Sequence, residues 1–127
     1  MEDSMPETIL LVDDETSVRQ LVRKILQLNG YTVLEASRGV DALQICQQHE
    51  GPIHLLLTDV MMPEMNGQNL AEQVTTLRPH IRVLYMSGYI DPLIALVGLR
   101  AEIAFIQKPF MPDALARKVR ETLGATR

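Results

Sequence analysis

The sequence predicts an α/β fold in which helices cover both faces of a doubly wound, five-stranded parallel sheet. Short apolar runs, typical of strands buried on both faces, alternate five times along the chain with stretches of helical pattern. No linker and no internal repeat interrupts this alternation, which is typical of strands joined by helical crossovers. At 127 residues the chain is expected to be one domain over 1–127, with its core at about 7–124.

The expected strands are short, and three of them end directly in charged residues. The first leads into Asp13-Asp14, the third into Asp59, and the fifth into Lys108-Pro109. Asp59 ends the most central apolar run of the chain. The strands are expected at residues 9–12, 31–36, 53–58, 81–86 and 103–106.

Five helices are expected between and after these strands. Asn29-Gly30 ends the first, as a left-handed C-cap does, and Pro112 suits the first turn of the last. The fourth, at 91–100, is apolar all round over 92–99, which fits either a well-covered helix or an exposed face for a partner or a second copy. The second helix is expected at 39–49. The other helices have apolar stripes: Val18, Leu21, Val22, Ile25 and Leu26 in the first helix, Leu70, Val74 and Leu77 in the third, and Leu115, Val119 and Leu123 in the last.

Composition narrows the function classes. The chain is 46% hydrophobic and 22% charged, which is typical of a globular protein, and its net charge of −4 gives no support to nucleic-acid binding. The one cysteine, Cys46, excludes an intramolecular disulfide and lies in an apolar stripe, so a buried thiol is expected. No apolar run reaches membrane-spanning length and residues 1–7 are acidic, so a cytoplasmic location without membrane contact is expected.

The charged strand ends predict a chemical site. The carboxyl ends of parallel strands share one sheet edge, where open α/β sheets bind ligands, so Asp13, Asp14, Asp59 and Lys108 should converge. Carboxylates held so close repel unless a cation intervenes, and Mg²⁺ suits such oxygen ligands. A carboxylate beside Mg²⁺ can attack phosphorus, while lysine shares the charge of the transferring group. Ser87, at the end of the fourth strand, offers a hydroxyl to a phosphoryl oxygen.

Four stretches of the chain resemble the response-regulator receiver domains (CheY-like) of two-component signalling. They extend from the first strand to the last helix, so the resemblance covers essentially the whole chain. It implies a flavodoxin-like sheet of order 2-1-3-4-5, and the later stretches are most like receivers of hybrid sensor histidine kinases. The matching stretches are residues 11–15 (LVDDE), 59–67 (DVMMPEMNG), 86–89 (MSGY) and 108–110 (KPF).

The resemblance assigns the phosphoryl chemistry to Asp59. It implies that Asp59 takes a phosphoryl group from the phosphohistidine of a histidine kinase or a histidine phosphotransfer domain. It also implies a Mg²⁺ (or Mn²⁺) site formed by Asp13, Asp14, Asp59 and the main-chain carbonyl of Met61. The domain would then be a switch with self-catalysed phosphotransfer and autodephosphorylation, and not an enzyme acting on a separate substrate.

The resemblance implies further roles around Asp59. Lys108 would pair with a phosphoryl oxygen, and the bond to Pro109, usually cis in receivers, would aim it into the cleft. Ser87 would be the switch hydroxyl and Phe105 the switch aromatic residue. Met61 and Tyr89 occupy the two positions that tune the lifetime of the phosphorylated form. Because one is apolar and the other bulky, we expect neither to position a hydrolytic water, and therefore a long lifetime.

Phosphorylation is expected to shift the surface formed by residues 91–100, the fifth strand and the last helix. That surface would bind a partner or form a phosphorylation-dependent homodimer. No effector domain is expected after the last helix, which fits a stand-alone receiver, a phosphorelay intermediate or a receiver taken from a larger protein.

Other functions fit the sequence less well. A degenerate receiver that binds proteins without phosphorylation is the main alternative, although all five site positions are intact. A metal-dependent phosphatase would need Asp-x-Asp after the first strand and a cap segment. The glycine fingerprints of dinucleotide-binding and P-loop domains are absent, and a flavin carrier would not fill its phosphate site with carboxylates.

Overall fold

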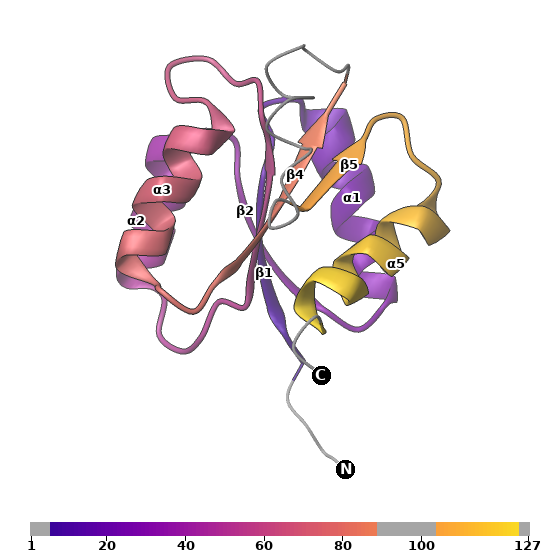
Figure 1. Ribbon diagram of the computed structural model, residues 1–127, viewed down its shortest axis with the longest axis horizontal. Coiled ribbons are helices and arrows are strands. Elements are labelled where there is room, and N and C mark those ends of the chain that lie inside the picture. Colours follow the sequence, from indigo (N-terminus) through magenta and orange to yellow (C-terminus); the bar gives the residue numbers. More distant parts are fainter. Residues whose placement is uncertain (1–5, 89–103, 125–127) are drawn as a thin grey trace.

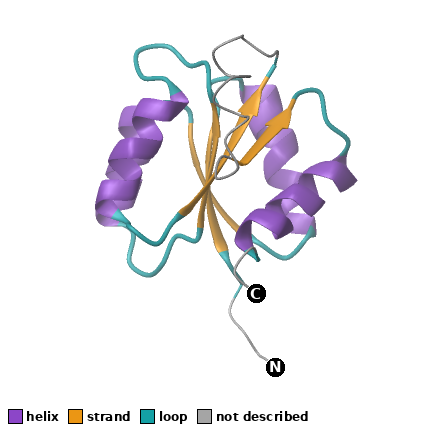
Figure 2. Ribbon diagram, viewed as in Figure 1, coloured by secondary structure: helices purple, strands orange, loops and turns teal. Residues whose placement is uncertain are grey.

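The computed structural model describes residues 6–88 and 104–124 and confirms the predicted fold class. Its five strands form one parallel sheet in the order β2-β1-β3-β4-β5. Helices α2 and α3 cover one face of the sheet, and α1 and α5 cover the other (Figures 1 and 2). The strands are β1 (Thr8–Val12), β2 (Thr32–Ala36), β3 (Leu55–Asp59), β4 (Arg82–Ser87) and β5 (Ala104–Gln107), and the helices are α1 (Thr16–Leu28), α2 (Gly39–Gln48), α3 (Gly67–Leu77) and α5 (Pro112–Leu123).

Two hydrophobic cores lie on opposite faces of the sheet. Alternate residues of β1 point to opposite faces, so Ile9 and Leu11 join the core under α1 and α5 while Leu10 and Val12 join the core under α2 and α3. All four side chains are fully buried, as expected for a central parallel strand. The cores fix β1 and β3 from both sides and thereby position the residues at their carboxyl ends.

The predicted helical stripes are partly wrong at their edges. Leu21 is 55% exposed, because it lies about 90° around α1 from the centre of the buried arc formed by Val22, Ile25 and Leu26. Leu77 is 42% exposed and is the last residue of α3. The remaining predicted members of these two stripes are buried or half-buried.

Several local predictions are confirmed. Asn29 is the C-cap of α1, and Gly30 follows with a φ of 89°, a left-handed conformation that glycine adopts without strain. Pro112 lies in the first turn of α5. Cys46 is buried at 4% exposure, and burial raises the pKa of its thiol. The predicted helix at 91–100 and its apolar segment lie outside the described residues.

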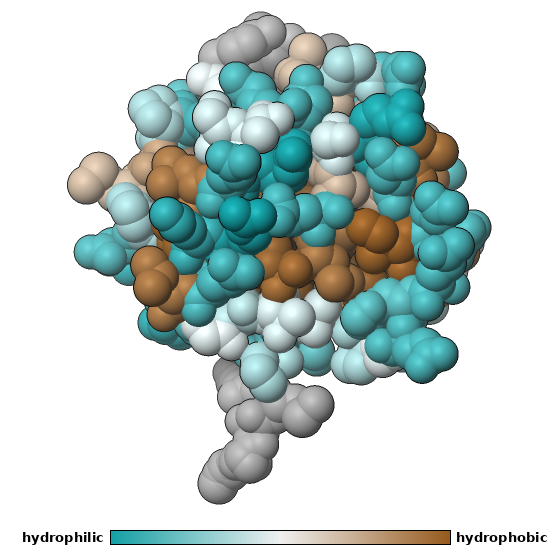
Figure 3. Space-filling model, turned by 180° about the vertical axis from the view of Figure 1, so that it is seen from behind, coloured by the Kyte–Doolittle hydropathy of each residue, from teal (hydrophilic) through white to brown (hydrophobic). Residues whose placement is uncertain are grey.

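The side of the molecule away from the viewer of Figure 1 combines polar and apolar areas. Hydrophobic side chains form a band across the middle of this face, between polar residues (Figure 3). Strand β2 ends the sheet, and its Val33 and Leu34 are half-buried, each packing against one of the two cores. Among the described residues, no helix has the length and apolar character needed to cross a membrane.

Candidate functional site

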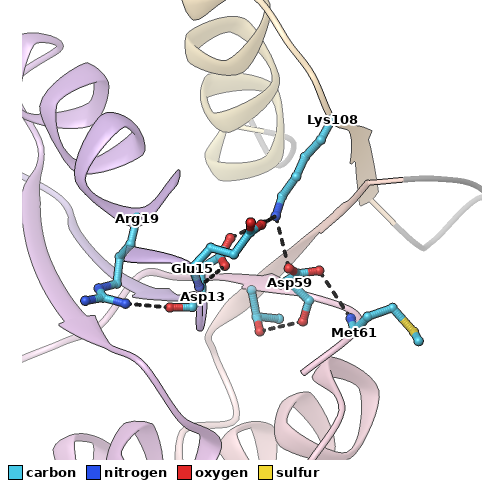
Figure 4. A network of polar contacts seen from close by, with 7 residues as sticks. Asp13, Glu15, Arg19, Asp59, Met61 and Lys108 are labelled. Carbon is cyan, nitrogen blue, oxygen red and sulfur yellow. Dashed lines mark hydrogen bonds and ion pairs between the residues drawn. The ribbon is translucent and has the colours of Figure 1, made fainter. Parts of the chain in front are cut away.

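Three strands of the sheet bring the charged residues together at their carboxyl ends. Asp13 follows β1, Asp59 is the last residue of β3, and Lys108 follows β5 (Figure 4). Because Val12 pairs with Thr58 in the β1–β3 register, the residues that come next lie side by side at the sheet edge. Asp13 is fully buried and Asp59 is 6% exposed. The sequence therefore correctly predicted which charged residues converge.

Lys108 bridges the two buried carboxylates. Its Nζ lies 2.9 Å from Oδ2 of Asp13 and 3.0 Å from Oδ2 of Asp59, and its side chain is 13% exposed. A third carboxylate, that of Glu15, has its Oε1 3.9 Å from the same Nζ. The Lys108–Pro109 peptide bond is cis, as the family resemblance suggested. The main-chain N–H of Lys108 donates to the carbonyl of Ser87 at 2.7 Å, which attaches this loop to the end of β4.

The other oxygen of each buried carboxylate accepts a main-chain hydrogen bond. Oδ1 of Asp13 accepts from the N–H of Glu15 at 2.9 Å, and Oδ1 of Asp59 accepts from the N–H of Met61 at 3.2 Å. Each carboxylate is thus held by a lysine on one oxygen and by the following turn on the other. Both groups are oriented before any ligand arrives.

Burial and charge act in opposite directions on the ionisation of the site. Burial raises the pKa of Asp59 and Asp13 raises it further, while the hydrogen bond and charge of Lys108 and the N–H of Met61 lower it; the net direction is upward. For Lys108, burial lowers the pKa, but the bonds and charges of Asp13 and Asp59 together raise it above its usual value. Lys108 is therefore protonated, and its positive charge favours the ionised form of Asp59.

The donor set fits Mg²⁺. Asp13, Asp14 and Asp59 each offer one carboxylate oxygen, and the three atoms lie within 4.8 Å of one another. Asp14 is exposed while the other two are buried, so the cluster is open to solvent on one side. Mg²⁺ prefers a few hard oxygen ligands and keeps several waters, which suits a cluster open on one side. The main-chain carbonyl of Met61 as a further ligand stays a prediction.

Gly67 allows α3 to begin close to Asp59. A Cβ at this position would overlap the main-chain O of Asp59 and lie 3.0 Å from Cα of Val60. The N–H of Gly67 donates to the carbonyl of Val60 at 2.9 Å, and the Asn66 side chain caps α3 by accepting from the N–H of Asn69. The loop between β3 and α3 is thereby tied back onto the end of β3.

The predicted switch residues lie on neighbouring strands. Ser87 is the last residue of β4 and is 1% exposed, and Met86 pairs with Asp59, so Ser87 lies one residue beyond the phosphoacceptor candidate. Phe105 is half-buried on β5 and pairs with Tyr85. Met61 is 54% exposed at the mouth of the site. Tyr89 lies outside the described residues.

Two charged residues behind the site, Arg19 and Glu35, were not predicted from the sequence. Arg19 of α1 donates from one terminal nitrogen to the carbonyl of Asp13 at 2.7 Å and from Nε to Glu35 at 3.3 Å (Figure 4 shows the contact with Asp13). Glu35, on β2, also accepts from Arg23 at 2.7 Å. One signal was available, because Glu35 is a charged residue that follows the apolar Val33 and Leu34 within one strand, and a partly buried charge requires a partner.

Comparison with known proteins places these features in one family. The family described as the response regulator receiver domain matches residues 9–120. The sensor kinase CckA of Brucella abortus is 39% identical over 117 residues, which cover 91% of this chain but only 12% of that kinase. A chemotaxis protein CheY homolog of Campylobacter jejuni is 34% identical over 123 residues, covering 91% of this chain and 92% of that protein.

A solved receiver-domain structure has the same fold. The crystal structure of the receiver domain from the hybrid histidine kinase CckA superimposes with a TM-score of 0.76 at 33% identity, covering 91% of this chain and 98% of that one. The predicted likeness to receivers of hybrid kinases is therefore confirmed.

Proposed function

This chain belongs to the response regulator receiver family, and on that premise we propose that it is a phosphoryl-accepting switch with Asp59 as the acceptor. The observation that carries the proposal is the bridge of Lys108 between two buried carboxylates at the carboxyl edge of the sheet. One of these carboxylates accepts the phosphoryl group and the other holds the metal. The same lysine then serves both the free and the phosphorylated form.

The transfer begins at a carboxylate oxygen of Asp59. This oxygen attacks the phosphorus of a phosphohistidine, the new P–O bond forms as the P–N bond breaks, and the electron pair returns to the imidazole nitrogen. No proton leaves Asp59, because its carboxylate is the nucleophile. Lys108, already 3.0 Å from Asp59, moves its ammonium onto a phosphoryl oxygen and offsets the added charge of about −1.5 to −2.

Asp13, Asp14 and Asp59, with the carbonyl of Met61, would hold Mg²⁺ beside the acceptor. When bound, the ion shares the negative charge on the phosphoryl oxygens with Lys108. The protein contributes a preformed ligand position. The Asp13 carboxylate accepts hydrogen bonds from the N–H of Glu15 and from Lys108, so it need not reorganise when the ion binds.

The output of the switch begins at Ser87 and Phe105. The Ser87 hydroxyl is drawn toward the phosphoryl group, and Phe105 turns inward as Ser87 moves. Phenylalanine has no hydroxyl, so neither end state of this side chain is fixed by a hydrogen bond. Phosphorylation thus shifts a balance between two existing conformations of the surface that includes β5 and α5.

The partners follow from the same proposal. The donor is a histidine kinase or a histidine phosphotransfer domain, and the shifted surface of residues 91–100, β5 and α5 is the candidate for a phosphorylation-dependent homodimer. We propose a cytoplasmic signalling domain that contacts neither nucleic acid nor membrane. Its chemistry is self-catalysed phosphotransfer and autodephosphorylation, and no separate substrate is turned over.

Intact-mass measurement with acetyl phosphate tests the proposal. With Mg²⁺ we expect one phosphoryl adduct, which disappears when EDTA is added and in Asp59→Asn. Lys108→Gln should bind Mg²⁺ and yet be phosphorylated far more slowly. An unmodified wild type that also fails to bind beryllofluoride would instead favour a degenerate receiver that binds proteins without phosphorylation.

The lifetime of the phosphoryl group depends on Met61 and Tyr89. We propose that these side chains shield the aspartyl phosphate from water, so that it persists for minutes. Met61 is 54% exposed and its N–H holds Asp59, so its side chain can be shortened without removing the main-chain bond. A Met61→Ala, Tyr89→Ala double variant should lose the phosphoryl group faster than wild type, and an unchanged rate would contradict shielding.

A further inference from the structure

We propose that Arg19, anchored by Glu35, is a positioning residue for the metal ligands: it fixes the peptide that joins Asp13 to Asp14. The proposal rests on the phosphoryl-transfer function proposed above and adds a residue to its machinery. We call Arg19 and Glu35 the Arg19 clamp.

The contacts of the clamp connect Glu35, on the edge strand β2, to the carbonyl of Asp13 at the site. Glu35 pairs with Leu11 in the β1–β2 register and accepts from Nε of Arg19 at 3.3 Å and from Arg23 at 2.7 Å. The guanidinium of Arg19 also donates to the carbonyl of Asp13 at 2.7 Å. The Arg19 side chain is 16% exposed and that of Glu35 is 25% exposed, so solvent screens this pair only partly.

The carbonyl of Asp13 is the point at which this chain of contacts acts on the metal site. Beyond Val12 the strand ladder ends, and it is followed by a long 3.3 Å bond from the Asp13 N–H to the carbonyl of Ala36. The peptide group is planar, so holding the Asp13 oxygen also fixes the plane that contains the N of Asp14. The orientations of Asp13 and Asp14 therefore both depend on the peptide group between them, which Arg19 holds.

An ordinary ion pair that only joins α1 to β2 would not require this geometry. Arg23 provides the comparison, because it shares Glu35 with Arg19 but makes no described contact with Asp13. Arg19 instead uses two separate nitrogens of one planar group to contact a carboxylate and a main-chain carbonyl. A lysine with a single ammonium cannot reproduce this arrangement.

The test measures Mn²⁺ affinity by electron paramagnetic resonance, with Mg²⁺ competition, in wild type and single variants. We expect Arg19→Gln and Arg19→Lys to raise the Mn²⁺ Kd about tenfold, the usual effect of losing a residue that orients a metal ligand, and Arg23→Gln to raise it less than about threefold. In acetyl phosphate reactions the Mg²⁺ needed for half-maximal rate should rise by the same factor in the Arg19 variants. At saturating Mg²⁺ their rate should return to within about threefold of wild type.

Unfolding in urea controls for stability. If the Arg19 variants do not fold, Glu35→Gln replaces them, since it removes the charge that anchors Arg19 but keeps Arg19 itself, and a Kd increase larger than that of Arg23→Gln is expected. Equal Kd increases in Arg19→Gln and Arg23→Gln, full recovery of affinity in Arg19→Lys, or wild-type affinity in every variant would each overturn the inference alone. A wild type that binds no Mn²⁺ and is not phosphorylated would overturn both the proposed function and the inference.

Discussion

Replacing the proposed acceptor, Asp59, by asparagine should stabilise the metal-free protein. Asparagine has nearly the shape of aspartate, and its side-chain oxygen can still accept from the N–H of Met61. It carries no charge, however, and the charge of Asp59 is buried beside that of Asp13. The residue proposed for function is thus expected to be unfavourable for stability.

The magnitude can be worked from the distances. The attraction of Lys108 for Asp59 at 3.0 Å is about 5 kcal/mol at an effective dielectric constant of about 20. Repulsion from a carboxylate oxygen of Asp13, at most 4.8 Å away, removes at least about 3.5 kcal/mol of this. Desolvation of the Asp59 carboxylate costs several kcal/mol, more than the remainder. Solvent screening and the weaker attraction of Lys108 to a neutral amide reduce the difference. We therefore expect Asp59→Asn to increase the free energy of unfolding by about 1 kcal/mol.

The pH dependence has a defined sign. Burial raises the pKa of Asp59 in the folded protein, so the folded state binds this proton more tightly than the unfolded state does. The contribution of Asp59 to the stability of the wild type therefore falls as pH rises above the ordinary range of an aspartate, while Asp59→Asn lacks this loss. The advantage of the variant should be present at pH 7 and disappear below about pH 4.

Urea unfolding followed by circular dichroism in EDTA measures the difference. A gain of about 1 kcal/mol would move the midpoint by about 0.5–1 M. Asp41→Asn is the matched control: Asp41 is an exposed carboxylate paired with Arg38 at 3.2 Å, and its loss should change stability by less than about 0.5 kcal/mol. The reasoning is refuted if Asp59→Asn is less stable than wild type at pH 7, or if its gain is the same at pH 4.

Three further substitutions test the scaffold of the site by urea unfolding. Arg78 donates to three main-chain carbonyls around the end of α2 at 2.7–3.1 Å, so Arg78→Met should cost about 2–3 kcal/mol, and a loss below about 1 kcal/mol would contradict this role. Glu64 has a φ of 72°, so Glu64→Asn should gain about 0.5 kcal/mol, and a loss would show that its side chain matters more than its backbone. Gly67→Ala should cost at least about 2 kcal/mol and slow phosphorylation of Asp59. Gly88→Ala, whose added carbon has no atom of residues 6–88 or 104–124 within 4 Å, should fold normally, and equal effects of the two substitutions would contradict the close approach at Gly67.

The sequence predicted the central part of the fold because two local signals agreed. The apolar runs of β1 and β3 are buried on both faces, and their continuity identified them without any knowledge of the tertiary structure. The charged residues of the site directly follow strands, so the rule for the carboxyl edge of parallel sheets was sufficient to bring Asp13, Asp59 and Lys108 together. Element order and the metal-ligand candidates could therefore be predicted.

Features that depend on tertiary distances could not be predicted. Helical spacing alone made Leu21 part of the buried stripe, whereas its exposure depends on how α1 lies on the sheet. The contact between Arg19 and the carbonyl of Asp13 joins the first turns of a helix to the end of a strand, and no residue pattern specifies it. The bridging position of Lys108, 95 residues from Asp13, likewise required the assembled sheet.

The most direct test of the central claim locates the phosphoryl group by chemical trapping. Borohydride reduces an aspartyl phosphate to homoserine, which peptide mass analysis assigns to one residue of the protein treated with acetyl phosphate and Mg²⁺. The account predicts homoserine at position 59 alone, and none when EDTA replaces Mg²⁺. Homoserine at position 13 or 14, or none under any condition in a folded, Mg²⁺-binding protein, would contradict it.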